Sequence, residues 1–389
     1  MALHLCFLCN EYPPEPHGGV GSLVQALGRA LVARGHDVTV LGVSASRPGV
    51  EDDEGVRVVR LPHARLRGTG FVVHGRRLRR ALAQVHRERP VDVVEGQEGA
   101  LAVLPRRRPY RTVIRMNGGH HFFATTLGRA PRPWRSWIER RSFRRADHLC
   151  AVSAYVGETT RSLLHLGDRP ITVLPNAVDT ERFRPSAVDG DPDRIAFAGT
   201  LCEKKGIRQL LEAFPAVLAR HPNAQLDVAG RDWVDEDGSF RARLEAALDP
   251  DTAAHVHFLG PVDHEALPDV LARASVCAFP SHMEAMPLAW LEGLAVGRPV
   301  LAGDIGPAPE VIEDGVSGVL CDPFDPAAIA DALNALLDDG ARRAALGREA
   351  RRRAESEFSI RVMVERNEAF FSACATAAPG SPVRVPTPG

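Results

Sequence analysis

Residues 279–293 read Phe-Pro-Ser-His-Met-Glu-Ala-Met-Pro-Leu-Ala-Trp-Leu-Glu-Gly. An apolar run that is typical of a strand ends near Phe279, and a helical pattern follows over 287–295. Pro287 suits the first turn of a helix, where a missing N–H is no loss. The stretch therefore predicts a strand, a loop and a helix in succession.

The predicted helix start favours an anion. Backbone N–H groups at a helix N-terminus lack intrahelical partners and lie at the positive end of the helix dipole, so they suit a diphosphate. Glu284 precedes this helix, near the place of a sugar carried by the diphosphate. Glu292 follows a turn inside the helix, where its carboxylate could accept hydrogen bonds from ribose hydroxyls. The other donor-binding candidates of the segment are Ala285, Met286, Pro287 and Leu288, with the amide of Ala289 beside them.

Short β-rich runs alternate with helical patterns through both halves. The predicted strands are 3–8, 37–43, 56–61, 91–95, 112–116, 148–152 and 171–174, then 194–198, 225–229, 256–259, 276–279, 299–302 and 318–320. The predicted helices are 21–34, 74–88, 133–145, 154–166, 206–220, 264–274, 287–295 and 326–338. Such alternation produces parallel sheets with helices on both faces. Two such sheets predict two Rossmann-like domains, with the ligand in the cleft between them.

Composition bounds the class of protein. The 389 residues suffice for two domains with their own cores, and no uncharged apolar run reaches the length that spans a bilayer. The first residues have no basic n-region, which argues against a signal peptide. The seven Cys are scattered and odd in number, which indicates a reducing, cytoplasmic setting. Cys6 and Cys9 fall in the apolar run that contains the first predicted strand, so we assign them to the core.

The two halves differ in charge. Residues 1–190 hold 29 Arg against 18 acidic residues, whereas the remainder holds 19 basic and 31 acidic residues. Opposite signs suggest domains that face different partners. The Arg runs at 76–80 and 106–108 are compatible with peripheral association at the inner membrane face or with a phosphorylated acceptor, although solvated surfaces are the plainer interpretation. No nucleic-acid motif accompanies them, so nucleic acid is not an expected partner.

The residues after Glu292 extend the pattern. Residues 297–306 read Gly-Arg-Pro-Val-Leu-Ala-Gly-Asp-Ile-Gly, and Glu310 and the run Asp-Gly-Val-Ser-Gly at 314–318 follow. With the E-x7-E spacing of Glu284 and Glu292, this region resembles family 4 of the glycosyltransferases. Two further matches are Leu-Pro-Asn-Ala-Val-Asp at 174–179 and Arg-Gly-His-Asp-Val at 34–38. The resemblance covers nearly the whole chain up to Ala375.

The resemblance implies the GT-B fold, an α/β architecture of two Rossmann-like domains with parallel sheets facing across a cleft. We expect an N-terminal acceptor domain over 1–183, a linker over 184–193, a C-terminal donor domain over 194–357 and a disordered tail over 375–389. A last helix over 358–374 would return to the first domain. The resemblance also implies retaining transfer of a sugar from a UDP- or GDP-sugar to a hydroxyl of a glycan, lipid-linked or small-molecule acceptor.

The only two Lys of the chain are adjacent, in the run Gly-Thr-Leu-Cys-Glu-Lys-Lys-Gly at 199–206. In a chain that otherwise uses Arg, this indicates a place for a compact, flexible ammonium. By resemblance, Lys205 contacts the donor diphosphate. The family usually has Arg where this chain has Thr200, and whether Lys204 replaces that contact stays open.

Two N-terminal loops complete the expected site. The first is Gly-rich and follows the first strand; by resemblance, the amides of Gly18 and Gly19 approach the donor phosphate or the acceptor. As a dinucleotide fingerprint this loop is weak, because it starts too far from the strand. The second follows the strand over 112–116, where the family places a His beside the sugar. Either His120 serves there, or Asn117 supplies only a hydrogen bond.

We expect no metal and no cofactor besides the nucleotide-sugar donor. Asp235 and Asp237 have the D-x-D spacing of a metal clamp, but they lie in a polar stretch without the matching architecture. The helix dipole and Lys205 would neutralise the leaving diphosphate instead. Two alternatives remain at this stage: a nucleotide-sugar epimerase of the same architecture, and a catalytically silent protein that binds sugar nucleotides.

Overall fold

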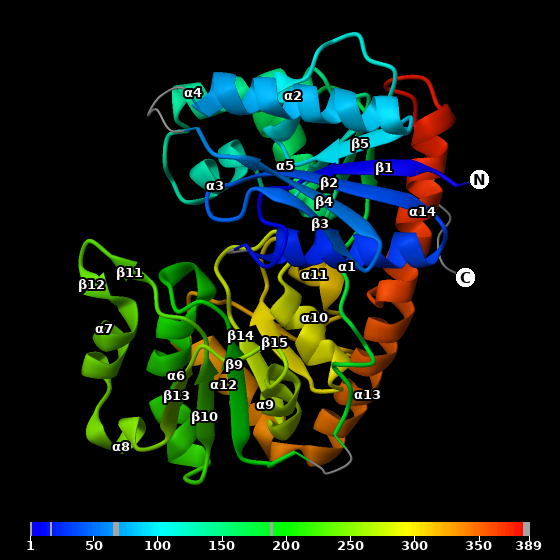
Figure 1. Cartoon of the computed structure of the whole chain (residues 1–389). Coiled ribbons are helices and arrows are strands. Elements are labelled where there is room, and N and C mark those ends of the chain that lie inside the picture. The colour runs from blue at the N-terminus through cyan, green and yellow to red at the C-terminus, as the bar shows by residue number, and fades with distance from the viewer. Residues whose placement is uncertain (1, 16–17, 65–69, 187–189, 384–389) are drawn as a thin grey trace. The chain divides into compact units, whose positions relative to one another are not determined.

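A computed structural model describes residues 2–15, 18–64, 70–186 and 190–383 (Figure 1). Contacts divide the chain into two compact units, Met1–Asn176 with Ile360–Gly389, and Ala177–Ser359. Residues 187–189 of the expected linker and 384–389 of the expected tail lie outside the described residues. No helix among the described residues is long and apolar enough to cross a membrane.

The first unit is built on an eight-stranded sheet with the order β3-β4-β2-β1-β5-β6-β7-β8. Its strands are β1 His4–Leu8, β2 Asp37–Ser44, β3 Gly49–Asp53, β4 Val56–Pro62, β5 Val93–Gly96, β6 Arg111–Met116, β7 His148–Ala151 and β8 Ile171–Val173. All pairings are parallel except that of β3 with β4. Every residue of β1 is buried, as in a sheet covered on both faces. Cys6 and Cys9 are buried too, so the core assignment is confirmed.

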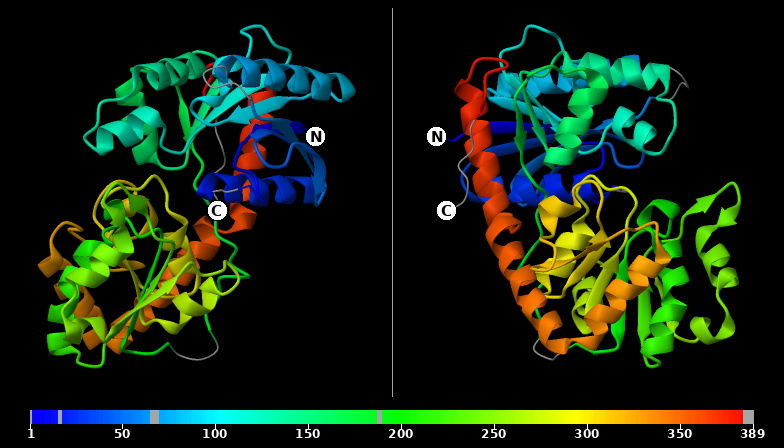
Figure 2. Two further views of the ribbon diagram at one scale, coloured as in Figure 1. Left: turned by 60° about the vertical axis from the view of Figure 1, so that its left-hand side comes forward. Right: turned by 180° about the vertical axis from the view of Figure 1, so that it is seen from behind.

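Helices cover both faces of this sheet. They are α1 Gly19–Ala33, α2 Gly70–Glu88, η1 Ala100–Val103, α3 His120–Thr126, α4 Pro133–Phe143, α5 Ala154–Leu164 and α14 Ile360–Thr376. α1 packs against α14, red in Figures 1 and 2, and α14 also contacts β5. Right-handed crossovers place α2, α4 and α5 on the opposite face.

A buried polar cluster fixes α14 to the first unit. Arg115 on β6 donates to both carboxylate oxygens of Glu95, at 2.7 and 3.0 Å, and also to Oδ1 of Asn367 on α14. The side chains of Arg115 and Glu95 are only 3% and 5% exposed. At the surface, Arg34 pairs with Glu368.

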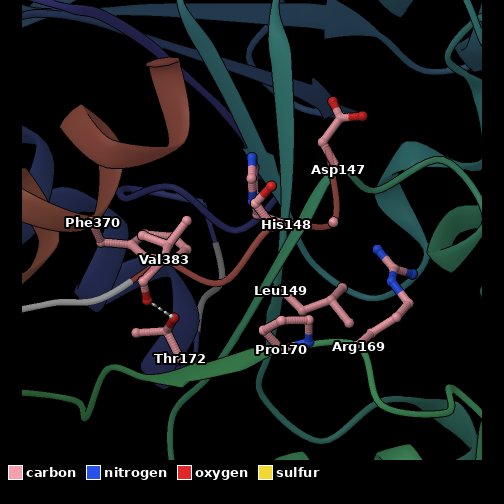
Figure 3. Close-up of a pocket in the computed structure, with 10 residues that line it drawn as sticks. Asp147, His148, Leu149, Arg169, Pro170, Thr172, Phe370 and Val383 are labelled. Atoms are coloured by element: carbon pink, nitrogen blue, oxygen red, sulfur yellow. Dashed lines mark hydrogen bonds between the residues drawn. The ribbon is translucent and has the colours of Figure 1, made fainter. Parts of the chain in front are cut away.

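The chain after α14 stays on the first unit as far as it is described. The Gly380 N–H donates to Asp147 O at 2.8 Å, and the Thr172 hydroxyl donates to Val383 O at 3.2 Å. Figure 3 shows a small hollow surrounded by Asp147, His148, Thr172, Val383 and Phe370 of α14. The described part of the expected disordered tail is therefore held against β7 and β8.

The second unit has a six-stranded parallel sheet with the order β13-β10-β9-β14-β15-β16. Its strands are β9 Arg194–Ala198, β10 Gln225–Ala229, β13 Val256–Gly260, β14 Val276–Phe279, β15 Val300–Gly303 and β16 Gly318–Cys321, with a separate hairpin of β11 Val234–Asp235 and β12 Gly238–Ser239. The helices are η2 Glu203–Lys205, α6 Ile207–Arg220, α7 Phe240–Ala247, α8 Pro250–Ala253, α9 Leu267–Arg273, α10 Leu288–Ala295, α11 Ala308–Val311, α12 Pro326–Asp338 and α13 Gly340–Glu357. α6 packs on α12, whereas α10 packs on α9 and α13.

The predicted α/β class is confirmed, with particular omissions. The edge strand β3 carries Gly-Val-Glu-Asp-Asp with mostly exposed residues, so it lacks the apolar alternation that signals a strand. It is also the one antiparallel strand of the described eight-stranded sheet. α13 is rich in Arg, Ala and Glu and buries few residues, so its apolar spacing is faint.

Candidate active site

The second unit has its topological switch point at β9, which lies between β10 and β14. Ligands of doubly wound sheets bind outside the carboxyl ends of the strands at such a point. The loop that carries Lys205 follows β9, and the loop that carries Glu284 follows β14. The two predicted site segments therefore leave neighbouring strands at the same edge of the sheet.

A glycine allows these two loops to touch. Gly206 has φ +67°, and a Cβ there would lie 1.7 Å from the carbonyl oxygen of Pro280. The backbone N–H of His282 then donates to Lys204 O at 2.8 Å. Any side chain at position 206 would force the loops apart, so the position requires glycine both for its backbone angle and for its space.

The contact places Lys205 against Glu284. The Lys205 ammonium donates to Glu284 Oε1 at 2.5 Å, with the two side chains 19% and 10% exposed. An ammonium has three donors, so this bond leaves Lys205 able to take an anionic oxygen as well. The main-chain carbonyl of the neighbouring Lys204 serves the loop contact with His282.

The helix start differs by one residue from the prediction. α10 begins at Leu288, and Pro287 is its N-cap, because its ψ of 135° is extended. The first-turn N–H groups are therefore those of Leu288, Ala289 and Trp290, and the predicted amide of Met286 lies before the cap. No side chain caps this terminus. Ala285 and Met286 form the bend that leads into it.

Glu292 lies inside α10 and is 7% exposed. The His264 ring lies near it, with Nε2 3.8 Å from Glu292 Oε1. That separation exceeds a hydrogen bond, so the carboxylate retains capacity to accept from a ligand hydroxyl.

A third loop reaches the same edge. Gly230, just after β10, lies so close to Gly199 that a Cβ would meet the Gly199 carbonyl oxygen at 1.7 Å. Arg231 follows, and its Nε donates to the Thr200 hydroxyl at 3.3 Å. A guanidinium from another loop thus stands beside the position where the sequence lacked an expected Arg. Sequence analysis missed Arg231, because only the folded sheet brings these loops together.

Asp235 of the D-x-D stretch forms an ion pair on the protein surface. Both carboxylate oxygens of Asp235 accept from Arg243 at 2.8 Å, on the small β11–β12 hairpin. No group of three or more His, Cys, Asp or Glu that could hold a metal ion occurs in the described ranges.

In the first unit the strand order reverses between β1 and β5. After β1, Gly18 is the N-cap of α1, and its N–H donates to Glu11 at 3.3 Å. Gly19 opens the helix, and no side chain caps it. The neighbouring residues 16–17 lie outside the described residues.

The loop after β6 lies over two buried carboxyl groups. The Asn117 N–H donates to Glu98 Oε1 at 2.6 Å. A Cβ at Gly119 would lie 1.9 Å from Glu139 Oε1 and 2.9 Å from Glu98 Cγ, so only glycine fits between them. Burial raises the pKa of Glu98 to about 7. Glu98 lies two residues after β5, so its place at the carboxyl end of a strand was predictable from the sequence. Glu139 lies within α4, where no sequence pattern indicates a site residue.

The two histidines that open α3 have different surroundings. His121 is buried and its Nδ1 contacts Glu139 Oε2. His120 lies on a cavity, and its Nε2 accepts from the Arg132 N–H at 2.7 Å. Burial lowers the pKa of His120. Because Nε2 is the acceptor, the proton of the neutral ring is on Nδ1. Asn117 does not line this cavity; its Nδ2 donates to Arg115 O at 3.2 Å.

The hollow in Figure 3 is not part of this arrangement. Its residues Arg169 and Pro170 precede β8, and Asp147 precedes β7, so it lies at the amino ends of the strands. Its volume is only about 10 Å³. The C-terminal segment packs against this hollow, so we do not assign it to a ligand.

Both halves of the chain match glycosyltransferase families, and relatives match over nearly its whole length. The family described as Glycosyl transferases group 1 matches residues 178–353, and Glycosyltransferase Family 4 matches residues 17–182. A glycogen synthase of Mycobacterium tuberculosis is 31% identical over 384 residues, covering 90% of this chain and 89% of that protein. A GDP-mannose-dependent monoacylated alpha-(1-6)-phosphatidylinositol monomannoside mannosyltransferase of Corynebacterium glutamicum is 28% identical over 387 residues, covering 92% and 94%.

Solved structures share the fold. Sucrose-phosphate synthase from Thermosynechococcus elongatus superposes with a TM-score of 0.80 at 21% identity, over 95% of this chain and 98% of that chain. Anabaena Alr3699/HepE, solved in complex with UDP and glucose, superposes with a TM-score of 0.71 at 17% identity, over 95% and 99%. These identities are too low to transfer a substrate, but they establish the architecture.

Proposed function

Because the chain belongs to family 4 of the glycosyltransferases, we propose that its second unit holds the nucleotide diphosphate and its first unit the acceptor. The chain is a retaining glycosyltransferase of the GT-B fold that uses a nucleotide-sugar donor. The epimerase and silent-binding alternatives therefore give way to transfer.

The observation that carries the donor assignment is the Lys205–Glu284 pair beside an uncapped helix start. Lys205 and the amides of Leu288 and Ala289 offer positive charge and donors to a diphosphate. Glu284 lies before the helix, within reach of a sugar attached there. Glu292 accepts from the ribose hydroxyls, which suits a mostly buried carboxylate inside the first turns.

In the reaction, the bond from the anomeric carbon to the diphosphate breaks while the acceptor oxygen bonds to that carbon from the same face. The diphosphate takes the acceptor proton, so no protein nucleophile is required. Lys205 and the helix terminus stabilise the charge that develops on the leaving group. Neither a metal nor a further cofactor enters the proposed step.

In the first unit we assign the donor-sugar contact to His120 rather than Asn117. The Nδ1–H of His120 is left for a sugar oxygen, whereas the Asn117 amide is already bonded to its own strand end. Gly18 and Gly19 are assigned to the phosphate or the acceptor, because the N-terminus of α1 offers main-chain donors.

The test is a thermal-shift panel of UDP- and GDP-sugars with the full chain. At about 100 times Kd, the correct donor should raise Tm by about 5 °C. Glu292→Ala should weaken nucleotide affinity about 10- to 100-fold, because hydrogen bonds to a charged group are lost. Glu203→Ala removes an exposed carboxylate of the Lys205 loop and is the control. A panel in which no nucleotide sugar shifts Tm, or in which both variants respond alike, would contradict the donor assignment.

Arg231 should supply the cation that Thr200 does not. We expect Arg231→Ala to raise the Kd of the nucleoside diphosphate about tenfold, the usual cost of one exposed phosphate contact. Thr200→Arg in the Arg231→Ala background should restore most of that affinity. Arg243→Ala removes an Arg of α7 that is paired with Asp235 of the β11–β12 hairpin, and it should leave affinity unchanged. Isothermal titration measures the Kd of the nucleoside diphosphate for the unmodified chain and the three variants. If Thr200→Arg did not restore affinity, Arg231 would not act at this position.

A further inference from the structure

Two adjoining cavities lie in the first unit. The larger, of about 390 Å³, is lined among others by Glu98, Gly119, His120, Phe123, Arg135 and Glu139. The smaller, of about 200 Å³, is lined by Leu41, Val43, Phe71, Leu78 and Val103 among others. Gly99 and Ile138 line both, so the two cavities are neighbours. Charged side chains line part of the larger cavity, whereas the smaller one is lined mostly by apolar side chains, with Asn10 and His74 as its polar residues.

The larger cavity is rich in hydrogen-bond acceptors. Glu98 and Glu139 are 6% and 3% exposed. Glu139 Oε2 accepts from the His121 N–H at 3.1 Å, but Glu139 Oε1 is buried with no hydrogen-bond partner in the described structure. That oxygen is itself shielded from the cavity, but the carboxyl groups of Glu98 and Glu139 both line the cavity and offer acceptor oxygens to a ligand. The wall therefore favours a ligand with hydroxyl or amino groups.

The same wall disfavours a phosphate. Arg135 is the one Arg or Lys among the residues that line the larger cavity in the described structure, against the two carboxyl groups. His120 adds no charge near neutral pH, because burial lowers its pKa. The Arg runs at 76–80 and 106–108 do not line it. The basic character of the N-terminal half thus says nothing about the charge of this cavity.

Phe71 connects the smaller cavity to an aromatic cluster. The ring of Phe71, which lines it, makes edge contacts with Trp134 at 5.2 Å and Trp137 at 5.7 Å. The two Trp rings stack at 5.0 Å and are 56% and 40% exposed. Aromatic side chains gathered at the surface beside an apolar cavity mark a binding site. Their occupant has an apolar body.

We propose that the acceptor is a small amphiphile without phosphate, whose hydroxyl- or amino-bearing part occupies the larger cavity and whose apolar part occupies the smaller one. The inference rests on the proposed function, which assigns the acceptor to the first unit. The adjoining cavities supply one polar and one apolar contact region for a single molecule. The Phe71–Trp134–Trp137 cluster extends the apolar region outward.

The experiment uses three matched probes: methyl glucoside, octyl glucoside below its micellar concentration, and octyl glucoside 6-phosphate. Binding to the full chain with saturating nucleoside diphosphate is measured by saturation-transfer NMR and titration. Octyl glucoside should bind at least about tenfold tighter than methyl glucoside, and at least about tenfold tighter than its 6-phosphate. Equal binding of all three, tighter binding of the phosphate, or no binding of any probe would overturn the proposal.

Variants assign the effect to each cavity. Phe71→Ala should weaken octyl glucoside about tenfold and leave methyl glucoside nearly unchanged. At about pH 8, where a carboxyl group of pKa about 7 is mostly ionised, Glu98→Gln should keep octyl glucoside affinity within about threefold but improve the 6-phosphate about tenfold, because one like charge is removed. Nucleotide affinity, read in the same samples, should not change. If the unmodified chain did not bind the nucleotide, the donor assignment would be refuted. If it bound the nucleotide but bound the three probes equally, only the proposed acceptor class would be refuted.

A bilayer is the competing occupant of the aromatic surface. Vesicles of phosphatidylglycerol and phosphatidylcholine, sedimented with the chain and with Trp134→Ala, test this directly. One outcome is that the unmodified chain binds vesicles, Trp134→Ala does not, and both proteins bind octyl glucoside no more tightly than methyl glucoside. The cluster is then a membrane contact and the proposal is wrong. If the preference falls in Trp134→Ala and vesicles bind neither protein, the small-molecule site stands.

Discussion

Lys205→Ala should transfer sugar with kcat/KM reduced about 10²- to 10³-fold, the usual cost of removing one preorganised donor from a developing negative charge. Lys205 lies at the switch point of the second sheet, 2.5 Å from Glu284. Its removal takes positive charge from the leaving diphosphate. It also leaves the Glu284 carboxylate, only 10% exposed, without its described cation and beside an anion.

The control is the adjacent lysine. Lys204→Ala keeps the main-chain carbonyl that accepts from His282, so we expect a loss within about tenfold. The double variant Lys205→Ala/Glu284→Ala should lose less than the product of the two single losses, because the residues act as a pair. Steady-state rates with the donor identified by the panel measure all variants. Equal rates for the Lys204→Ala and Lys205→Ala proteins would remove Lys205 from the site.

Arg115→Met should lower the free energy of unfolding of the first unit by about 3–5 kcal/mol, because it leaves Glu95 as a buried, uncompensated charge. The substitution also removes the donor to Asn367, through which β6 holds α14. Urea unfolding followed by circular dichroism measures the change. The two units can unfold separately, so the transition that shifts identifies the first unit.

The matched control is the exposed pair that links α1 to α14. Arg34 is 43% exposed and pairs with Glu368, so Arg34→Ala should cost at most about 1 kcal/mol. Arg115→Met with Glu95→Met should recover part of the loss, because no charge is then left buried. If Arg34→Ala and Arg115→Met destabilised equally, burial would not be the reason that the inner pair matters.

Prediction from sequence succeeded where the signal was local. Strand-to-helix alternation fixes the parallel sheets, and residues just after a strand, such as Lys205 and Glu284, lie at the carboxyl edge by construction. β3 was missed because an exposed edge strand needs no apolar alternation. Arg231 and Glu139 were missed for another reason. Each gains its place from a segment distant in sequence: Arg231 from Thr200, and Glu139 from His121.

The donor assignment keeps its predicted residues with one change of register. Pro287 caps α10 instead of opening it, which moves the first-turn donors to Leu288, Ala289 and Trp290. Such one-residue shifts depend on the ψ angle of a single residue, which no periodicity encodes. Peripheral membrane association through the Arg runs, the alternative to a solvated surface, stays a prediction.

The return of α14 to the first unit has a consequence for how the molecule is made. Residues 177–359 form a continuous insertion, so the second unit has its whole sequence available before synthesis ends. The first unit is incomplete until the last residues are synthesised, because Arg115 bonds to Asn367 and α1 packs on α14. Because domains fold as units during synthesis, the second unit should mature first. A chain truncated before residue 360 would therefore lose the first unit and not the second.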